Sequence, residues 1–315
     1  MPIVGITALV PPEIVYATGN APLDINNFVP NSKVIPKDKL CAWTAIWREL
    51  ALMGSIKLDK LVVVAGGDCN NAIVDGEKLE RAGIDTHYFM YPFDGSQKTM
   101  KEEVLKLVDF LGGGLDKAVF KGVDNLKKMA ARIDRDRLEG RVGSQEGFAI
   151  EVSASDLDGD MERFKEKIER VKTGRVTNDY RVALLGTPPV YSDFHSFLES
   201  IGMHVVYDEM PYEFIRLGGR SINAIAGSYS GYTFARNISH RIEFLKKELK
   251  KRGVDGIVHF HQFACHHKLE DPILREALSM EGYPYISIEA DLPSNTPEQI
   301  KLRMEAFKER LGEYS

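Results

Sequence analysis

GIVHFHQFACHH, residues 256–267, joins an apolar run to a cysteine at position 265. The nine residues before Cys265 are rich in β-branched and aromatic side chains, which predicts a buried strand. A helix is expected to begin near Asp271 and Pro272, because aspartate and proline are both favoured at the start of a helix. A strand, a cysteine and a helix in this order make one unit of a parallel α/β sheet.

The same alternation of apolar strands and amphipathic helices runs through both halves of the chain. In the first half, the strand predicted at 60–67 (KLVVVAGG) is followed by Cys69 and a helix, and 86–93 (THYFMYPF) is a further strand. Strands of the second half are predicted at 181–189 (RVALLGTPP), 204–210 (HVVYDEM) and 283–291 (YPYISIEAD). We expect two flavodoxin- or Rossmann-like parallel-sheet lobes that repeat one architecture.

A charged, helical segment separates the two sets of strands. It contains KEEVLKLVDFLGG at 101–113 and MERFKEKIERVK at 161–172, both with the spacing of amphipathic helices. The predicted organisation is an N-terminal α/β lobe over 1–99, a helical bridging segment over 100–178 and a C-terminal α/β lobe over 179–315.

The composition and charge argue against a nucleic-acid-binding protein, a membrane-spanning protein and a secreted protein. The chain has 315 residues and a formal net charge of −5, so it does not offer the basic face that a nucleic-acid partner requires. No apolar run approaches the roughly 20 residues of a transmembrane helix. The N-terminus lacks a basic region and its apolar run breaks at Pro11 and Pro12, which predicts a first strand and turn instead of a signal peptide. A cytoplasmic protein without a membrane partner is expected.

The chain has three cysteines, an odd number that does not suit a disulfide framework. Cys69 and Cys265 follow strands, and Cys41 begins the helix predicted over 39–53. The carboxyl ends of parallel strands are where such sheets bind ligands, and a helix N-terminus stabilises a thiolate. Burial as core filler explains a single cysteine but not three at this edge. Across a cleft, the three thiolates suit an iron–sulfur cluster with one iron left open.

The histidines near Cys265 allow a second interpretation, a zinc site made of Cys265, His259, His261 and His266. Strand alternation places His259 and His261 on one face and Gln262 on the other. The zinc site would leave Cys41 and Cys69 unexplained. Beside an iron–sulfur cluster, the candidates to hydrogen-bond sulfur, ligate iron or donate a proton are His261, Gln262 and His266.

The sequence resembles the 2-hydroxyacyl-CoA dehydratase / benzoyl-CoA reductase subunit family, of the D-component type. The similarity covers nearly the whole chain in the family's order, and is loose only over 100–180. The stretches that carry it are PPEIVYATGNAPLDI (11–25), LCAWTAIWRELALMG (40–54), GGDCNNAIVDGEKL (66–79), VDGIVHFHQFACHHKLEDPILREAL (254–278) and GYPYISIEADLPSNTPEQIKLRMEAF (282–307).

The resemblance implies that Cys41, Cys69 and Cys265 hold a 4Fe–4S cluster in the interlobe cleft. It also implies an ATP-dependent activator that supplies one low-potential electron, so that a ketyl radical of an acyl-CoA can lose water. The implied enzyme is a lyase or a low-potential reductase that pairs with a like or unlike subunit. Glu13 and Tyr16 are weaker catalytic candidates, taken from the family motif. With three cysteines, the chain cannot by itself hold the doubled cluster of some relatives.

Two alternatives stay open. The first is an electron-relay or accessory subunit that binds a cluster but no substrate. The second is an enzyme that uses the open iron on a small molecule without CoA, for example to remove sulfur. A basic, solvent-open channel to the cluster would favour acyl-CoA, whereas a closed, apolar surround would favour the relay.

Overall fold

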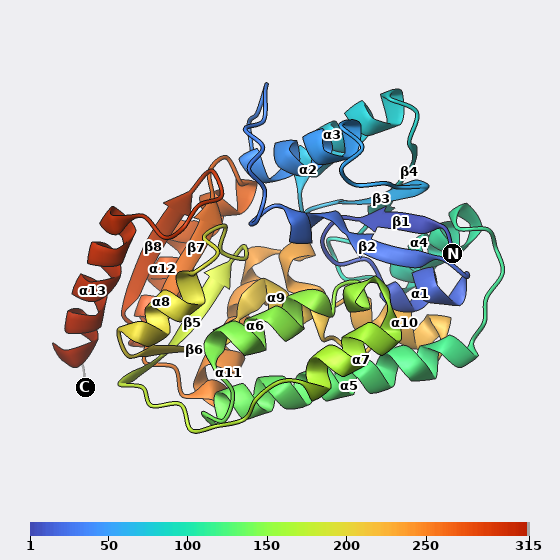
Figure 1. The fold of residues 1–315 in the computed structure, drawn as a ribbon. Coiled ribbons are helices and arrows are strands. Elements are labelled where there is room, and N and C mark those ends of the chain that lie inside the picture. The colour runs from blue at the N-terminus through green and yellow to red at the C-terminus, as the bar shows by residue number, and fades with distance from the viewer. Residues whose placement is uncertain (314–315) are drawn as a thin grey trace.

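The computed structural model describes residues 1–313, and its runs of buried Val, Ile and Leu form two separate parallel sheets (Figure 1). Strands buried on both faces need helices on each side, and helices cover both sheets. The predicted α/β fold with two lobes is confirmed. No helix within residues 1–313 is long and apolar enough to cross a membrane.

The first sheet has the order β2-β1-β3-β4, with every neighbouring pair parallel. Its strands are β1 (Ile3–Ile6), β2 (Ala21–Asp24), β3 (Lys60–Ala65) and β4 (Asp85–Met90). The accompanying helices are α1 (Pro12–Ala17), the 3₁₀ turn η1 (Ile25–Phe28), α2 (Ala42–Leu52) and α3 (Asn70–Arg81).

The second sheet repeats this order as β6-β5-β7-β8, again parallel throughout. Its strands are β5 (Tyr180–Gly186), β6 (Met203–Asp208), β7 (Gly256–Gln262) and β8 (Tyr285–Ala290). Its helices are α8 (Phe194–Ser200), α11 (Ile238–Arg252), η4 (His266–Glu270), α12 (Asp271–Ser279) and α13 (Glu298–Glu313). The expectation that one architecture is used twice is confirmed.

The order of strands places a ligand-binding edge in each lobe. In both sheets the first strand lies between the second and the third. The second strand therefore pairs with one edge of the first strand, and the third strand pairs with its other edge, which makes a switch point between β1 and β3 and between β5 and β7. Ligands bind α/β sheets at this switch point, outside the carboxyl ends of the strands. The two edges correspond in detail: the amide of Thr7 donates to Val62 at 3.1 Å, and the amide of Thr187 donates to Phe260 at 3.0 Å.

Helices between the two sheets bind the lobes together. They are α4 (Gln97–Phe110), α5 (Ala118–Leu138), α6 (Ser144–Ser153), the turn η2 (Leu157–Gly159) and α7 (Met161–Glu169). In Figure 1, α5 passes beneath both lobes. Its side chains, among them Phe120 and Leu126, share one hydrophobic core with β1, β3 and α1.

The same core receives helices that follow β6 in the sequence. These are α9 (Glu209–Phe214), α10 (Ile222–Tyr229) and the turn η3 (Thr233–Ala235). Phe214, Ile225 and Tyr229 pack in the core built around β1 and β3, and α10 lies against α4. The chain therefore crosses back to the first sheet before it returns to β7.

Candidate functional site

Each cysteine is the N-cap of a helix. Cys41 caps α2, Cys69 caps α3 and Cys265 caps η4. Cysteine is not among the residues that helix capping favours, so helix formation alone does not account for the three positions. All three line one cavity of about 510 Å³ whose walls come from both lobes.

Cys41 is buried, Cys69 and Cys265 are half-buried, and the three thiols are close enough to influence one another electrostatically. Burial raises the pKa of Cys69 well above its ordinary value, and Asp68, Cys41 and Cys265 raise it further. Burial likewise raises the pKa of Cys265 to about 12, with Cys41 and Asp68 adding to the effect. The pKa of Cys41 is also raised, again mainly by burial. Three thiolates here need a compensating positive charge, which a metal centre provides.

The donor set fits an iron–sulfur cluster better than a single ion. Thiolates select zinc, copper(I) or iron–sulfur centres among the biological metals. Within residues 1–313, no three His, Cys, Asp or Glu side chains are arranged closely enough to ligate one ion. Cysteines that bind different irons of a cluster lie farther apart than ligands of one ion, so three converging but separated thiols agree with a cluster.

The histidines predicted as zinc ligands do not converge with Cys265. His259 Nδ1 lies 2.7 Å from Asp271 Oδ1, and the Tyr285 hydroxyl is 2.8 Å from the same nitrogen. His261 packs edge-on against His259, and His266 Nε2 lies 3.0 Å from the Gly67 carbonyl. None of the three lines the cavity. The zinc interpretation finds no support in this geometry.

The predicted polar candidates are distributed unevenly. Gln262 lines the cavity, donates through Nε2 to the Asp291 carbonyl, and has a buried Oε1 without a hydrogen-bond partner among the described residues. Glu13 lies in the core, where Lys127 (3.0 Å) and the Tyr229 hydroxyl (2.8 Å) donate to it.

Tyr16 is also away from the cavity. Its hydroxyl donates to the Asp156 carbonyl at 2.9 Å, and burial raises its pKa. The structure therefore brings Gln262 together with the three cysteines. His261, His266, Glu13 and Tyr16 lie outside the cavity lining.

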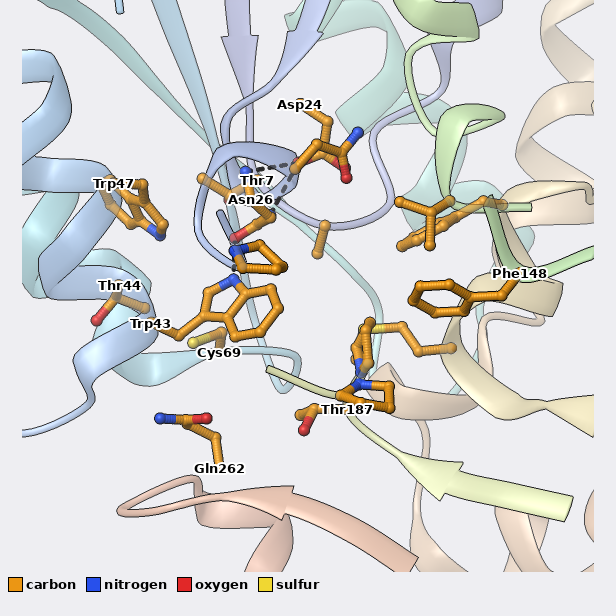
Figure 2. Close-up of a pocket in the computed structure, with 18 of the residues that line it drawn as sticks. Thr7, Asp24, Asn26, Trp43, Thr44, Trp47, Cys69, Phe148, Thr187 and Gln262 are labelled. Atoms are coloured by element: carbon orange, nitrogen blue, oxygen red, sulfur yellow. Dashed lines mark hydrogen bonds between the residues drawn. The ribbon is translucent and has the colours of Figure 1, made fainter. Parts of the chain in front are cut away.

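Other residues of the cavity were not anticipated from the sequence. Figure 2 shows side chains from both lobes around the space, with Trp43 and Asn26 from the first lobe, Phe148 from α6, and Thr187 and Gln262 from the second. The Trp43 indole donates to Asn26 at 2.9 Å. Thr7 and Thr187 follow the central strands of their sheets, so the strand-end rule applied to β1 and β5 would have found both.

Carboxyl groups dominate the charge of the cavity. Burial raises the pKa of Asp24 to about 6, and burial together with Asp24 raises that of its neighbour Asp156 to about 7. Asp68 accepts a hydrogen bond of 2.6 Å from the Tyr232 hydroxyl. Lys167, paired with Ser153 and Asp158, is the one lysine or arginine in the described lining. Amides and aromatic rings make up much of the remaining wall.

A family comparison covers the second half of the molecule. The family model described as "2-hydroxyglutaryl-CoA dehydratase, D-component" matches residues 146–311, which include most of α6, the whole second sheet and Cys265. No curated protein sequence matches the chain.

Proposed function

The chain belongs to the family of the 2-hydroxyglutaryl-CoA dehydratase D-component, and on this premise we propose that it is a catalytic, cluster-bearing subunit of the 2-hydroxyacyl-CoA dehydratase type. In this proposal Cys41, Cys69 and Cys265 hold a 4Fe–4S cluster between the lobes. Its partners are an ATP-dependent activator and a second subunit, like or unlike, in a cytoplasmic complex.

One observation supports a catalyst over an electron relay. The three thiols border a cavity of about 510 Å³, a size typical of small-molecule sites, with polar and aromatic walls. A relay needs only a buried centre, and space beside it would serve no purpose. When bound, the cluster would supply the low-potential electron and an iron with a free coordination position. The chain's own residues would bind and orient the substrate.

The residues around the cavity suggest how the substrate would be held. Asn26 and Gln262 offer amide groups from opposite lobes, and Trp43 and Phe148 offer flat apolar surfaces. The buried Oε1 of Gln262 has no hydrogen-bond partner among the described residues, and a rotation of this amide toward the cavity would let it accept a hydrogen bond from a substrate hydroxyl. These contacts suit a 2-hydroxyacyl group.

The scarcity of cationic groups keeps a substrate without CoA as the second candidate. The phosphates of CoA prefer arginine and lysine, and Lys167, the one lysine or arginine that lines the cavity within residues 1–313, is already paired. If the substrate is an acyl-CoA, its phosphates must lie outside the cavity. A small molecule would need no such extension.

The proposal is tested by metal analysis of anaerobically purified protein. We expect iron and acid-labile sulfide near a 4:4 stoichiometry per chain, the composition of a 4Fe–4S cluster. Cys265→Ser should lose the cluster and thermal stability together, because bound metal contributes folding free energy. Met280→Ser is the matched control, because Met280 is an exposed sulfur residue of the same lobe. Zinc in place of iron, or a full cluster in Cys265→Ser, would overturn the proposal.

Ligand titrations separate the candidates. The spectrum of the reduced cluster should change on anaerobic addition of 2-hydroxyglutaryl-CoA, a substrate class taken from the family. A response to free 2-hydroxyglutarate alone would favour the enzyme that acts without CoA. An unchanged spectrum with a broad panel of acyl-CoAs and small anions would favour the electron relay.

A further inference from the structure

We infer that His195, oriented by Asp208, is the acid–base residue of the cavity and exchanges a proton with the substrate through Nδ1. The inference rests on the proposed function, because it takes the cavity as the substrate site. It adds a residue that lies outside all the cysteine segments.

Three elements place the His195 ring. His195 belongs to α8, is 2% exposed, and lines the cavity. Its Nε2 is 2.8 Å from Oδ1 of Asp208, the last residue of β6. The Phe148 ring from α6 stacks on the imidazole with 4.1 Å between centroids and 27° between planes. The ring is therefore held on its edge by a carboxylate and on one face by an aromatic side chain.

The charges behind the histidine determine its tautomer. Asp208 Oδ2 accepts a bond of 2.6 Å from Arg137. Burial opposes ionisation of Asp208, yet His195 and Arg137 together hold its pKa below the ordinary value. An ionised carboxylate can only accept hydrogen bonds, so Nε2 must carry the proton between His195 and Asp208. Asp134 and Glu151 also pair with Arg137, and Arg252 pairs with Asp134.

The other nitrogen is left free for a ligand. Within residues 1–313, Nδ1 of His195 has no hydrogen-bond partner, and this nitrogen is not fully buried. With Nε2 protonated, Nδ1 carries the lone pair. A carboxylate that fixes the tautomer of a histidine and stabilises its protonated form is the arrangement of a general base.

The proton transfers balance for loss of water from a 2-hydroxyacyl group. The β C–H bond breaks, its proton binds Nδ1, and its electron pair stays on the substrate. The α C–O bond breaks and hydroxide leaves with that bond's pair, so a C=C bond forms. The imidazolium then returns its proton to hydroxide, giving water. Imidazole is regenerated, and the proton transfers consume no oxidant or reductant.

A second histidine of the same lobe provides a matched control. His204 is equally buried and also pairs with a carboxylate, at 3.0 Å from Glu199. Both its nitrogens are occupied, since Nε2 lies 2.9 Å from the Arg137 carbonyl, and it does not line the cavity. Replacing His204 therefore tests the loss of a buried histidine–carboxylate pair without touching the proposed acid–base site.

The test compares His195→Phe, His195→Gln and His204→Phe as holoproteins with the activator and 2-hydroxyglutaryl-CoA. Both His195 variants should keep the cluster and the ligand-induced spectral change, while the dehydration rate falls about 10²–10⁴-fold, as for loss of a general base. KM should change little. His204→Phe should keep the rate per folded protein. In ¹⁵N-histidine spectra of the oxidised holoprotein, the His195 signal should show the Nε2–H tautomer.

The outcomes that overturn the inference differ from those that overturn the function. A wild-type rate in His195→Phe, or an Nδ1–H tautomer, would refute the acid–base role. Loss of cluster and ligand response in both His195 variants would show a structural role instead. A wild-type protein with neither cluster nor ligand response would refute the proposed function itself.

Discussion

The carboxyl group of Asp24 lies in the cavity wall, where burial disfavours its ionised form. It is fully buried, and its pKa is raised to about 6 by burial, although the Asn26 amide donates to its Oδ1 at 3.0 Å. Its neighbour Asp156, raised to about 7, accepts the Asp24 amide at 2.8 Å. The charge of Asp24 raises the pKa of Asp156, so the two carboxyl groups ionise in sequence and the pair is only partly ionised just below neutral pH.

Asp24→Asn should make the protein less sensitive to pH. A carboxyl whose pKa is raised on folding stabilises the fold below its unfolded pKa, near 4, and loses that stabilisation as the pH rises through the folded value. The free energy of unfolding of the variant relative to wild type should therefore increase from about pH 4 to about pH 7 and then level off. A folded shift of about 2 units corresponds to about 3 kcal/mol. Urea unfolding from pH 4 to pH 8 measures the difference, and a constant difference would show that Asp24 is ionised throughout.

The histidines of 256–267 show how far single residues could be predicted. Alternation along β7 correctly separated His259 and His261 from Gln262, because a strand's side chains point to opposite faces by geometry alone. It could not say which face meets the cavity. Helices α11 and α12 cover the histidine face, where His259 pairs with Asp271, and Gln262 is left on the cavity side.

At the scale of an element, the end of β5 depends on a glycine. Gly186 has φ +87° and lies so close to β7 that a Cβ would overlap the Phe260 carbonyl oxygen. The next residues, Thr187, Pro188 and Pro189, line the cavity. The close approach of β5 to β7 and the shape of this wall therefore need the absence of a side chain at 186.

Gly186→Ala should destabilise the protein by about 3 kcal/mol or more, because it adds backbone strain and an overlap with a backbone atom that cannot move away. Gly253→Ala is the matched control. Gly253 also has a positive φ, +58°, but among the described residues no neighbouring segment comes within 4 Å of a Cβ there, so Gly253→Ala should lose only about 1 kcal/mol. Urea denaturation measures both. Equal losses would mean that strain alone, not the contact with β7, makes glycine necessary.

Across the whole molecule, a buried ionic network joins the helical bridging segment to the second lobe. Arg137 of α5 donates to Asp208 of β6 (2.6 Å) and Glu151 of α6 (2.7 Å). Arg252 of α11 donates to Asp134 of α5 at 2.7 Å. α5 also packs in the core of the first lobe, so it connects both halves of the fold.

Arg137→Met should therefore weaken the whole protein. Removing one member of a buried ion pair leaves its partners uncompensated and costs about 3–5 kcal/mol. Tryptophan fluorescence reports Trp47 in the first lobe's core and Trp43, which packs against both lobes, whereas far-ultraviolet circular dichroism reports the entire fold. The midpoints of both signals should fall together. Arg170→Met, in an exposed pair with Glu166, is the control and should change neither. A lower midpoint in circular dichroism alone would show that the lobes unfold independently.

Local periodicity and strand-end chemistry determined much of this molecule from the sequence alone. The two sets of parallel strands, the helical segment between them and the cysteines at helix N-termini all follow from residues close together in the chain. Only the tertiary structure decided that α9 and α10 pack in the first lobe's core, and that His195 meets Asp208 and Phe148. These contacts join segments whose own patterns do not specify a partner. Which buried surfaces meet depends on the packing of the complete chain, because many helix faces are apolar enough to fill the same space.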